Sequence, residues 1–370
     1  MTSLFVKIKG YVGEFLLDFE HNFNSNGITV LYGSNGSGKS TIISTLAGFI
    51  NNLETKIVLN DKIIENTKIS PPHKRPFGTM FQNPILFEHM NVNQNLDFPI
   101  NRNKSLNKTL IPKEDLINHL ELNSLLKRYP QNLSGGEKLR VALARTILKQ
   151  SDYLLLDEPM SDLDIKTKAR ILNFLKMINK KFKIPILYVS HSIEEISQIA
   201  DEIILLNNGK KVSSGSLSKI LNSNSFQKLI GKFESSSVLE GILSETNQLM
   251  KITTLDVNGQ KLIVPGRPGL IGNIVRVRIR SRDVIVSPVR VNTHITENQL
   301  EGIITNIYTE KDTAFSELVI NLKNSKINKK SQLLRARITT YNLNKMKIAE
   351  NKKVFIYISS VSIDRQAYQY

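Results

Sequence analysis

The segment Gly33-Ser-Asn-Gly-Ser-Gly38-Lys39-Ser40 is the strongest indication of the fold, because it has the G-x-x-x-x-G-K-[ST] spacing of a phosphate-binding loop. It follows an apolar run that predicts a strand, Ile28–Tyr32, and precedes a helical pattern. Glycines in such a loop let backbone N–H groups surround phosphate oxygens, and the helix start adds a favourable dipole. A simple glycine-rich turn is the alternative, which the strand and helix on either side disfavour. The residues expected to bind nucleotide are Gly33, Ser34, Asn35, Gly36, Ser37, Gly38, Lys39, Ser40 and Thr41.

A second acidic motif follows the apolar run Tyr153–Leu156. Such a strand would deliver Asp157 to the edge of a sheet, where a carboxylate can hold Mg²⁺ through water, together with the Ser40 hydroxyl. Glu158 is then placed to orient or deprotonate an attacking water. A buried strand that ends in acidic residues is common, so the motif gains its weight from the phosphate loop.

The segment Leu133-Ser134-Gly135-Gly136-Glu137 has two interpretations. The S-x-x-E spacing predicts a helix capping box, and apolar residues recur after it at helical intervals. A capping box does not require two consecutive glycines, however. Backbone N–H groups and the Ser134 hydroxyl at a helix start would form a second anion-binding surface. Two copies that meet head to tail around a two-fold axis could then enclose nucleotide between them.

Composition excludes several kinds of site. The 370 residues include no cysteine and no tryptophan, which rules out disulfides, thiol nucleophiles and cysteine-ligated zinc or iron–sulfur clusters. The net charge of +17 suits nucleic acid or an anionic membrane surface, but it equally fits a lysine-rich composition bias. The apolar runs are strand-length and the first residues are interrupted by charges, so we expect neither a membrane span nor a secretory signal, and a cytosolic protein.

The chain divides into two regions with different sequence patterns. Up to residue 233, apolar strands alternate with helical patterns, which is typical of an α/β parallel sheet. Beyond Glu234-Ser-Ser-Ser237 the pattern is of short strands only, including the alternating Val275–Arg280. We therefore predict domains over residues 1–233 and 236–370. Further predicted strands are Ile186–Val189, Ile203–Leu206, Ile252–Val257, Lys261–Val264, Leu318–Ile320 and Val354–Ile358, with hairpin turns at Asn207-Asn208-Gly209 and Asn258-Gly259.

In the order of its motifs, the region 1–233 resembles the ATP-binding cassette (ABC) transporter ATPases. This resemblance implies a RecA-like P-loop NTPase cassette with a helical subdomain at about residues 86–150, which binds ATP and Mg²⁺. The family's Q-loop matches Phe81-Gln82-Asn83-Pro84, its signature Leu133–Glu137, its D-loop Ser161-Asp162-Leu163-Asp164, and its switch histidine His191. The resemblance implies catalytic roles for Glu158, His191 and Gln82, a metal site of Ser40, Gln82 and Asp157, and nucleotide contacts from Tyr11, Ser134, Gly135, Gly136, Glu137 and Asp164. Phe5 and Phe15 compete with Tyr11 for the adenine.

Further segments that extend over both regions are Gly27–Tyr32, Pro71–Arg75, Arg276–Val284, Leu334–Ile338 and Ile358–Ile363. In these segments the chain resembles importer ATPases with a C-terminal OB-like (TOBE/Mop) barrel, and among them the molybdate-importer group. A Mop-like module is expected at about residues 292–365. The resemblance implies a homodimer, integral-membrane permease subunits, an extracytoplasmic solute-binding protein as an indirect partner, and a peripheral place on the cytoplasmic membrane face. Where this module often has a small polar residue before Arg-Asn, the chain has Ile295-Thr296-Glu297-Asn298. Because Glu297 would repel an oxyanion, a dimerisation barrel is the favoured role.

Two alternatives remain open. One keeps the importer but changes its cargo to sulfate, ferric iron, a polyamine or a sugar, since an ATPase subunit does not contact the transported solute. The other is a soluble ABC ATPase linked to nucleic acid. The single cassette and the absence of a long heptad arm between its motifs disfavour it, so no nucleic-acid partner is expected.

Overall fold

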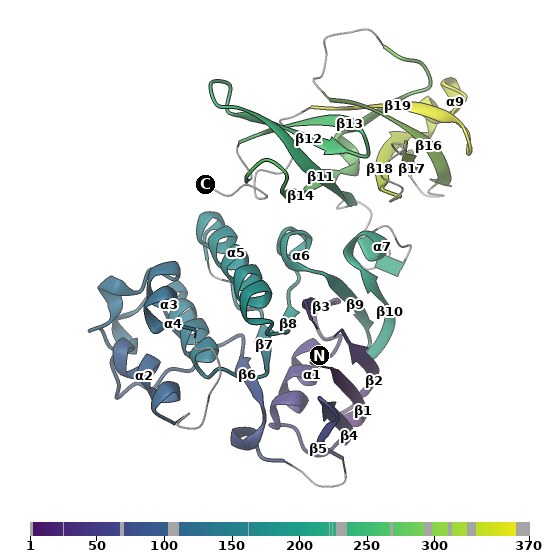
Figure 1. Ribbon diagram of the computed structural model, residues 1–370. Helices are drawn as coiled ribbons and strands as arrows, with labels where there is room; N and C mark the ends of the chain where they lie inside the picture. The colour runs from purple at the N-terminus through teal and green to yellow at the C-terminus, as the bar shows by residue number, and fades with distance from the viewer. Residues whose placement is uncertain are drawn as a thin grey trace. The chain divides into compact units, whose positions relative to one another are not determined.

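The structure is a computed structural model that forms two compact units, Met1–Ser216 and Leu217–Tyr370 (Figure 1). It describes residues 3–24, 26–66, 70–102, 111–161, 163–221, 223, 225–226, 235–266, 269–291, 298–309, 313–323 and 331–359. Among the helices within these ranges, none is long and apolar enough to cross a membrane.

The first unit is built on a ten-stranded mixed sheet within the described residues, in the order β5-β4-β1-β2-β10-β9-β3-β8-β7-β6. The five strands from β9 to β6 run parallel, whereas β5, β4, β1 and β2 pair antiparallel. The strands are β1 Leu4–Val12, β2 Phe15–Phe23, β3 Ile28–Tyr32, β4 Glu54–Leu59, β5 Lys62–Glu65, β6 Phe77–Met80, β7 Tyr153–Asp157, β8 Ile186–Val189, β9 Glu202–Asn207 and β10 Lys210–Ser216.

The parallel strands are apolar because helices and other elements bury both faces of them. Every residue of β3, β7 and β8 is buried, as their mainly apolar sequences predict. The carboxyl ends of parallel strands meet at one edge of a sheet, where ligands bind in open α/β folds. The loops after β3, β6, β7 and β8 carry the phosphate loop, Gln82, Glu158 and His191, so four distant segments converge there.

The helices of the first unit fall into two groups. Three of them, α2, α3 and α4, form a helical subdomain in which α4 packs against α2 and against β6 (Figure 1). The helices are α1 Lys39–Ala47, α2 Val92–Arg102, α3 Lys113–His119, α4 Gly135–Leu148, α5 Ile165–Phe182 and α6 Ile193–Ile199, with 3₁₀ turns at Pro72–Lys74, Asn123–Leu125 and Pro130–Asn132.

The second unit contains α7 and two antiparallel sheets, ordered β13-β12-β11-β14 and β15-β19-β16-β17-β18. Both sheets contribute to one apolar core, as expected of the predicted OB-like domain. Its elements are α7 Leu217–Leu221, β11 Ser236–Asn247, β12 Ile252–Val257, β13 Gln260–Pro265, β14 Ile274–Arg280, a 3₁₀ turn Ser281–Asp283, β15 Val284–Ser287, β16 Asn298–Thr309, β17 Phe315–Leu322, β18 Leu333–Thr339, α9 Thr340–Lys345 and β19 Lys353–Ile358.

Side-chain amides bridge these two sheets in the manner of a strand pair. The Asn298 amide accepts from the Ile263 N–H at 2.5 Å and donates to the Ile263 carbonyl at 2.9 Å. Gln260 bonds both backbone groups of Glu301, and Gln332 bonds both backbone groups of Glu240. These bridges satisfy backbone groups that the gap between two sheets would otherwise leave without partners.

The predicted hairpin turns are confirmed. Asn208 and Gly209 join β9 to β10 with φ of 46° and 75°, and Asn258 and Gly259 join β12 to β13 with φ of 56° and 80°. Positive φ at both central residues is the conformation that Asn-Gly favours in two-residue hairpins.

The predicted alternation in β14 holds with one exception. Arg278, expected on the polar face, is only 7% exposed. Its Nε donates to the Ser236 hydroxyl at 3.1 Å, so a cross-strand hydrogen bond offsets part of the cost of burial.

Candidate nucleotide-binding and hydrolysis site

The phosphate loop lies between β3 and α1 in a conformation that its glycines make possible. Gly36 and Gly38 have φ of 77° and 100°. A Cβ on Gly33 would lie 2.4 Å from the Leu206 carbonyl oxygen and 2.6 Å from the Ser37 hydroxyl, so no larger residue fits there. The Ser37 hydroxyl is buried and has no hydrogen-bond partner among the residues that the structure describes. The loop is therefore a close-fitting cradle, and its Ser37 hydroxyl is available to bond a ligand.

Lys39 is held inside this cradle. Its Nζ donates to the carbonyls of Gly33 and Ser34, both at 2.9 Å. Burial lowers the pKa of Lys39, while the nearby carboxylates of Glu158 and Asp157 raise it in part. The ammonium thus lies among oxygen atoms of the loop, where a phosphate could replace the carbonyls as its partner.

Three residues predicted to be catalytic come together after β6, β7 and β8. The Gln82 amide donates to Glu158 Oε2 at 3.2 Å, and His191 Nδ1 lies 3.3 Å from Glu158 Oε1. The Glu158 N–H donates to the Val189 carbonyl at 3.1 Å, and Glu158 has φ of 47°. Strained backbone of this kind costs energy, and it concentrates at functional sites. Glu158 is thus held between an amide and an imidazole.

The residues expected to hold Mg²⁺ have the chemistry for it. Asp157 is 3% exposed, and within the described part of the chain its buried Oδ1 has no hydrogen-bond partner. Burial raises the pKa of Asp157, and a hydrogen bond with Ser40 partly opposes this effect. A buried carboxylate oxygen without a partner is costly, and a bound divalent cation would relieve that cost. The oxygen donors of Asp157, Ser40 and Gln82 therefore fit a magnesium ion.

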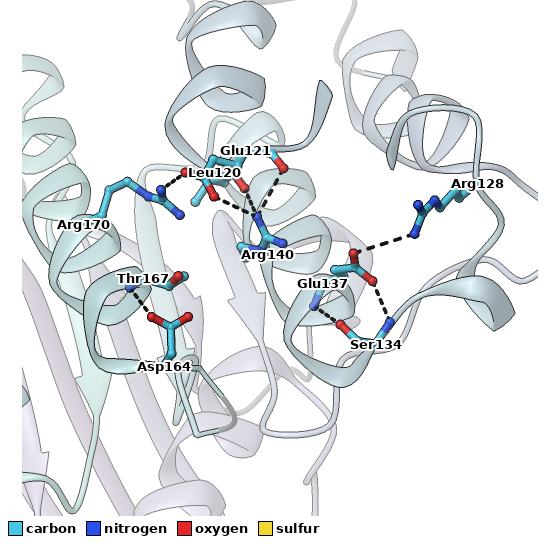
Figure 2. Close-up of polar contacts among 9 residues, drawn as sticks. All are labelled: Leu120, Glu121, Arg128, Ser134, Glu137, Arg140, Asp164, Thr167 and Arg170. Atoms are coloured by element: carbon cyan, nitrogen blue, oxygen red, sulfur yellow. Dashed lines mark hydrogen bonds and ion pairs between the residues drawn. The ribbon is translucent and has the colours of Figure 1, made fainter. Parts of the chain in front are cut away.

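The signature segment begins α4 in the helical subdomain, and its capping box is confirmed (Figure 2). The Ser134 hydroxyl accepts from the Glu137 N–H at 3.3 Å, and the Ser134 N–H donates to Glu137 Oε2 at 2.7 Å. The latter bond holds the pKa of Glu137 below its ordinary value, and Arg128 lies 3.9 Å from the same carboxylate. Ser134 and Gly135 remain exposed, so the capping box leaves the start of α4 accessible.

The D-loop aspartate Asp164 caps α5 by accepting from the Thr167 N–H at 3.0 Å, while Asp162 lies outside the described residues (Figure 2). The hydrogen bonds with Thr167 lower the pKa of Asp164. Nearby, Arg170 of α5 contacts the Glu121 carboxylate, and Arg140 of α4 donates to the Glu121 carbonyl at 3.2 Å. Glu121 thereby connects α4, in the helical subdomain, with α5.

The three candidate adenine-stacking aromatics differ in exposure. Tyr11, in β1, is 61% exposed, whereas Phe5 and Phe15 are half-buried. The Phe15 ring lies 3.2 Å from the position of a Cβ on Gly38, so it packs against the phosphate loop. Exposure favours Tyr11, and proximity to the loop favours Phe15.

One buried carboxylate, which contacts the residue before His191, was not predicted from the sequence. Glu195 in α6 is buried and accepts hydrogen bonds from Tyr188 and Ser190. A signal was present, because Ser192 and Glu195 have the same S-x-x-E spacing as Ser134 and Glu137.

The first unit is similar to known ATP-binding cassettes in sequence and in fold. The ABC transporter family matches residues 16–161. Two solved ATP-binding cassettes of ABC transporters, one nucleotide-free and one with ADP, align with TM-scores of 0.53 and 0.52 at 23% and 24% identity. Each alignment covers 62% of this chain, and they cover 99% and 98% of those chains respectively. The chain belongs to the family of ABC transporter ATPases, enzymes that bind and hydrolyse ATP.

Relatives that match along nearly the whole chain belong to one group of these ATPases. The molybdenum import ATP-binding protein ModC of Aliivibrio fischeri is 32% identical over 97% of this chain and 98% of its own length. The protein of the same name from Haemophilus influenzae is 33% identical, over 97% and 99%. The similarity therefore extends over both units.

Proposed function

We propose that this chain is the ATP-hydrolysing subunit of an importer for molybdate. The observation that carries the proposal is the similarity to molybdenum import ATP-binding proteins over both units. In this role the protein lies on the cytoplasmic face of the membrane and works with integral-membrane permease subunits. An extracytoplasmic solute-binding protein delivers the oxyanion to that permease.

We assign hydrolysis to the residues gathered around Glu158. Its carboxylate accepts a proton from water as the water oxygen bonds to the terminal phosphorus of ATP. The bond from that phosphorus to the bridging oxygen breaks, and ADP and phosphate are released. Gln82 and His191, both in contact with Glu158, orient the water and the terminal phosphate. Lys39 exchanges its loop carbonyls for phosphate oxygens.

Mg²⁺ would be held by Ser40, Asp157 and Gln82. Bound there, it would neutralise charge on the phosphates and on the buried Asp157 carboxylate. The backbone N–H groups from Gly33 to Thr41 surround the phosphates, and the exposed Tyr11 stacks on adenine.

Two copies close on ATP head to tail in this proposal. The exposed helix start at Ser134 supplies the second phosphate-binding surface, with Gly135, Gly136 and Glu137, and Asp164 faces the other copy. Closure then reaches the permease through the loop after Gln82, because that loop connects the catalytic residues to the helical subdomain.

For the second unit we propose a structural and dimerising role rather than oxyanion sensing. The Asn298 amide is fully buried and already bonded to Ile263, which favours a structural use. Glu297 lies outside the described residues, so its predicted repulsion of oxyanions stays a prediction.

Uptake of radiolabelled molybdate tests the cargo. Cells that lack the gene are complemented with the wild-type gene or with Glu158→Gln. Wild type should restore uptake, the variant should not, and excess sulfate should compete weakly. Restored sulfate uptake without molybdate uptake would contradict the cargo. A purified ATPase stimulated by DNA or RNA in a strongly salt-dependent way would contradict the importer itself.

A further inference from the structure

The carboxylate of Glu195 lies behind the catalytic residues and is only 7% exposed. Its Oε2 accepts from the Tyr188 hydroxyl at 2.9 Å and from the Ser190 hydroxyl at 2.7 Å. Its Oε1 lies 3.3 Å from the Lys168 ammonium. A buried carboxylate is stable only when it is paired and hydrogen-bonded, and here both oxygens have partners from other segments.

Contacts of Glu195 on both sides of His191, one from its carboxylate and one from its backbone N–H, hold the loop that carries this histidine. Ser190, before the histidine, donates its hydroxyl to Glu195, and Ser192, after it, accepts from the Glu195 N–H at 3.3 Å. Ser190 also accepts from the Ser192 N–H at 3.0 Å. The exposed imidazole is thus carried by a short loop that is fixed on both sides.

The third contact reaches α5. The Lys168 side chain pairs with Glu195, while its backbone N–H donates to the Asp164 carbonyl at 2.9 Å in the first turn of α5. Asp164 is the aspartate of the matched D-loop. One buried carboxylate therefore connects the His191 loop to the helix start that carries Asp164.

We propose that Glu195 is a positioning residue that fixes the His191 loop relative to the start of α5, so that the switch histidine and the D-loop move together. The proposal rests on the proposed function, in which Asp164 faces a second copy. A change at the D-loop on dimer closure would then be passed to His191 and, through it, to Glu158. Without this connection each copy would still bind ATP but would align it less well for hydrolysis.

The test uses the full-length protein with three substitutions, Glu195→Gln, Lys168→Met and the control Lys166→Met. The substitution Glu195→Gln keeps a side-chain oxygen for Tyr188 and Ser190 but removes the charge that pairs with Lys168. Lys166 is an exposed lysine in the same helix. The first two variants should lower kcat about tenfold or more, since small misplacements of reacting groups are costly, and leave KM for MgATP within about twofold. Lys166→Met should leave both unchanged.

Hydrogen–deuterium exchange of the ATP-free protein gives a readout that does not depend on turnover. Glu195→Gln should speed exchange over residues 189–194, and both pair variants should speed it over 163–168. Unchanged exchange in Glu195→Gln and Lys168→Met would overturn the proposal, and so would faster exchange with a normal kcat. A lowered melting temperature without these changes in exchange and kcat would also overturn it. The dimer mechanism of the proposed function is tested separately. It would be wrong if wild-type kcat did not depend on protein concentration across the range in which dimers form. In that case the exchange data would still test whether Glu195 connects the His191 loop to the start of α5.

Discussion

Removing the guanidinium of Arg75 should strongly destabilise the first unit, because this buried group satisfies the end of the phosphate-loop helix. Arg75 Nη1 donates to the carbonyls of Thr45 and Leu46 in the last turn of α1, both at 2.8 Å, and Nε donates to the Ser70 carbonyl at 2.9 Å. Nη2 contacts the buried Glu65 carboxylate. Burial lowers the pKa of Arg75, which reflects the cost of keeping the charge there.

Arg75→Met keeps much of the side-chain volume but leaves the Glu65 carboxylate buried without its charge partner. Breaking one half of a buried ion pair costs about 3–5 kcal/mol. At roughly 2–4 °C per kcal/mol for a domain of this size, the melting temperature of the first unit should fall by about 6–20 °C. The free energy of unfolding should recover in part in Arg75→Met/Glu65→Leu, because the double variant removes both charges but still lacks the bonds to the Thr45, Leu46 and Ser70 carbonyls.

Differential scanning calorimetry of the full-length protein measures this change, with the transition of the first unit identified by its shift on adding ATP. Lys74→Met, at an exposed neighbouring position, is the matched control. It should change the free energy of unfolding of the first unit by less than about 0.5 kcal/mol. A melting temperature for Arg75→Met within the error of wild type would refute the reasoning, as would a double variant less stable than the single one.

Other substitutions test the site and the second unit. Glu158→Gln should lower kcat by about 10²–10⁴-fold and let an ATP-bound dimer accumulate in size-exclusion chromatography; wild-type turnover would exclude Glu158 as the base. Gly33→Ala should abolish ATP binding in equilibrium dialysis, because the Cβ would lie 2.4 Å from a backbone oxygen; unchanged affinity would mean that the loop can relax. Asn298→Ala should cost the second unit about 2–4 kcal/mol in urea unfolding, since two Ile263 backbone groups lose their partners; a cost below about 0.5 kcal/mol, the level of ordinary surface substitutions, would show that water replaces the amide.

Local patterns made much of the fold predictable. Some features depend only on the backbone preferences of a few adjacent residues, so the residue types predict them. They are the phosphate loop, the Ser134 capping box and the two Asn-Gly turns. Mainly apolar runs likewise predicted β3, β7 and β8, because strands buried on both faces admit few polar residues. These elements, and the residue types of the phosphate site, could therefore be predicted without a structure.

Contacts between residues far apart in the sequence depend on how the chain folds and could not be predicted in this way. Gln82 and Glu158 are 76 positions apart, and their contact exists because β6 and β7 are parallel neighbours in the sheet. The burial of Arg278 and Glu195, and the connection from Glu195 to Lys168, depend on which segments pack beside them. Local preference fixes the conformation of a short segment, whereas a buried charge is stable only if the folded chain supplies its partners from elsewhere.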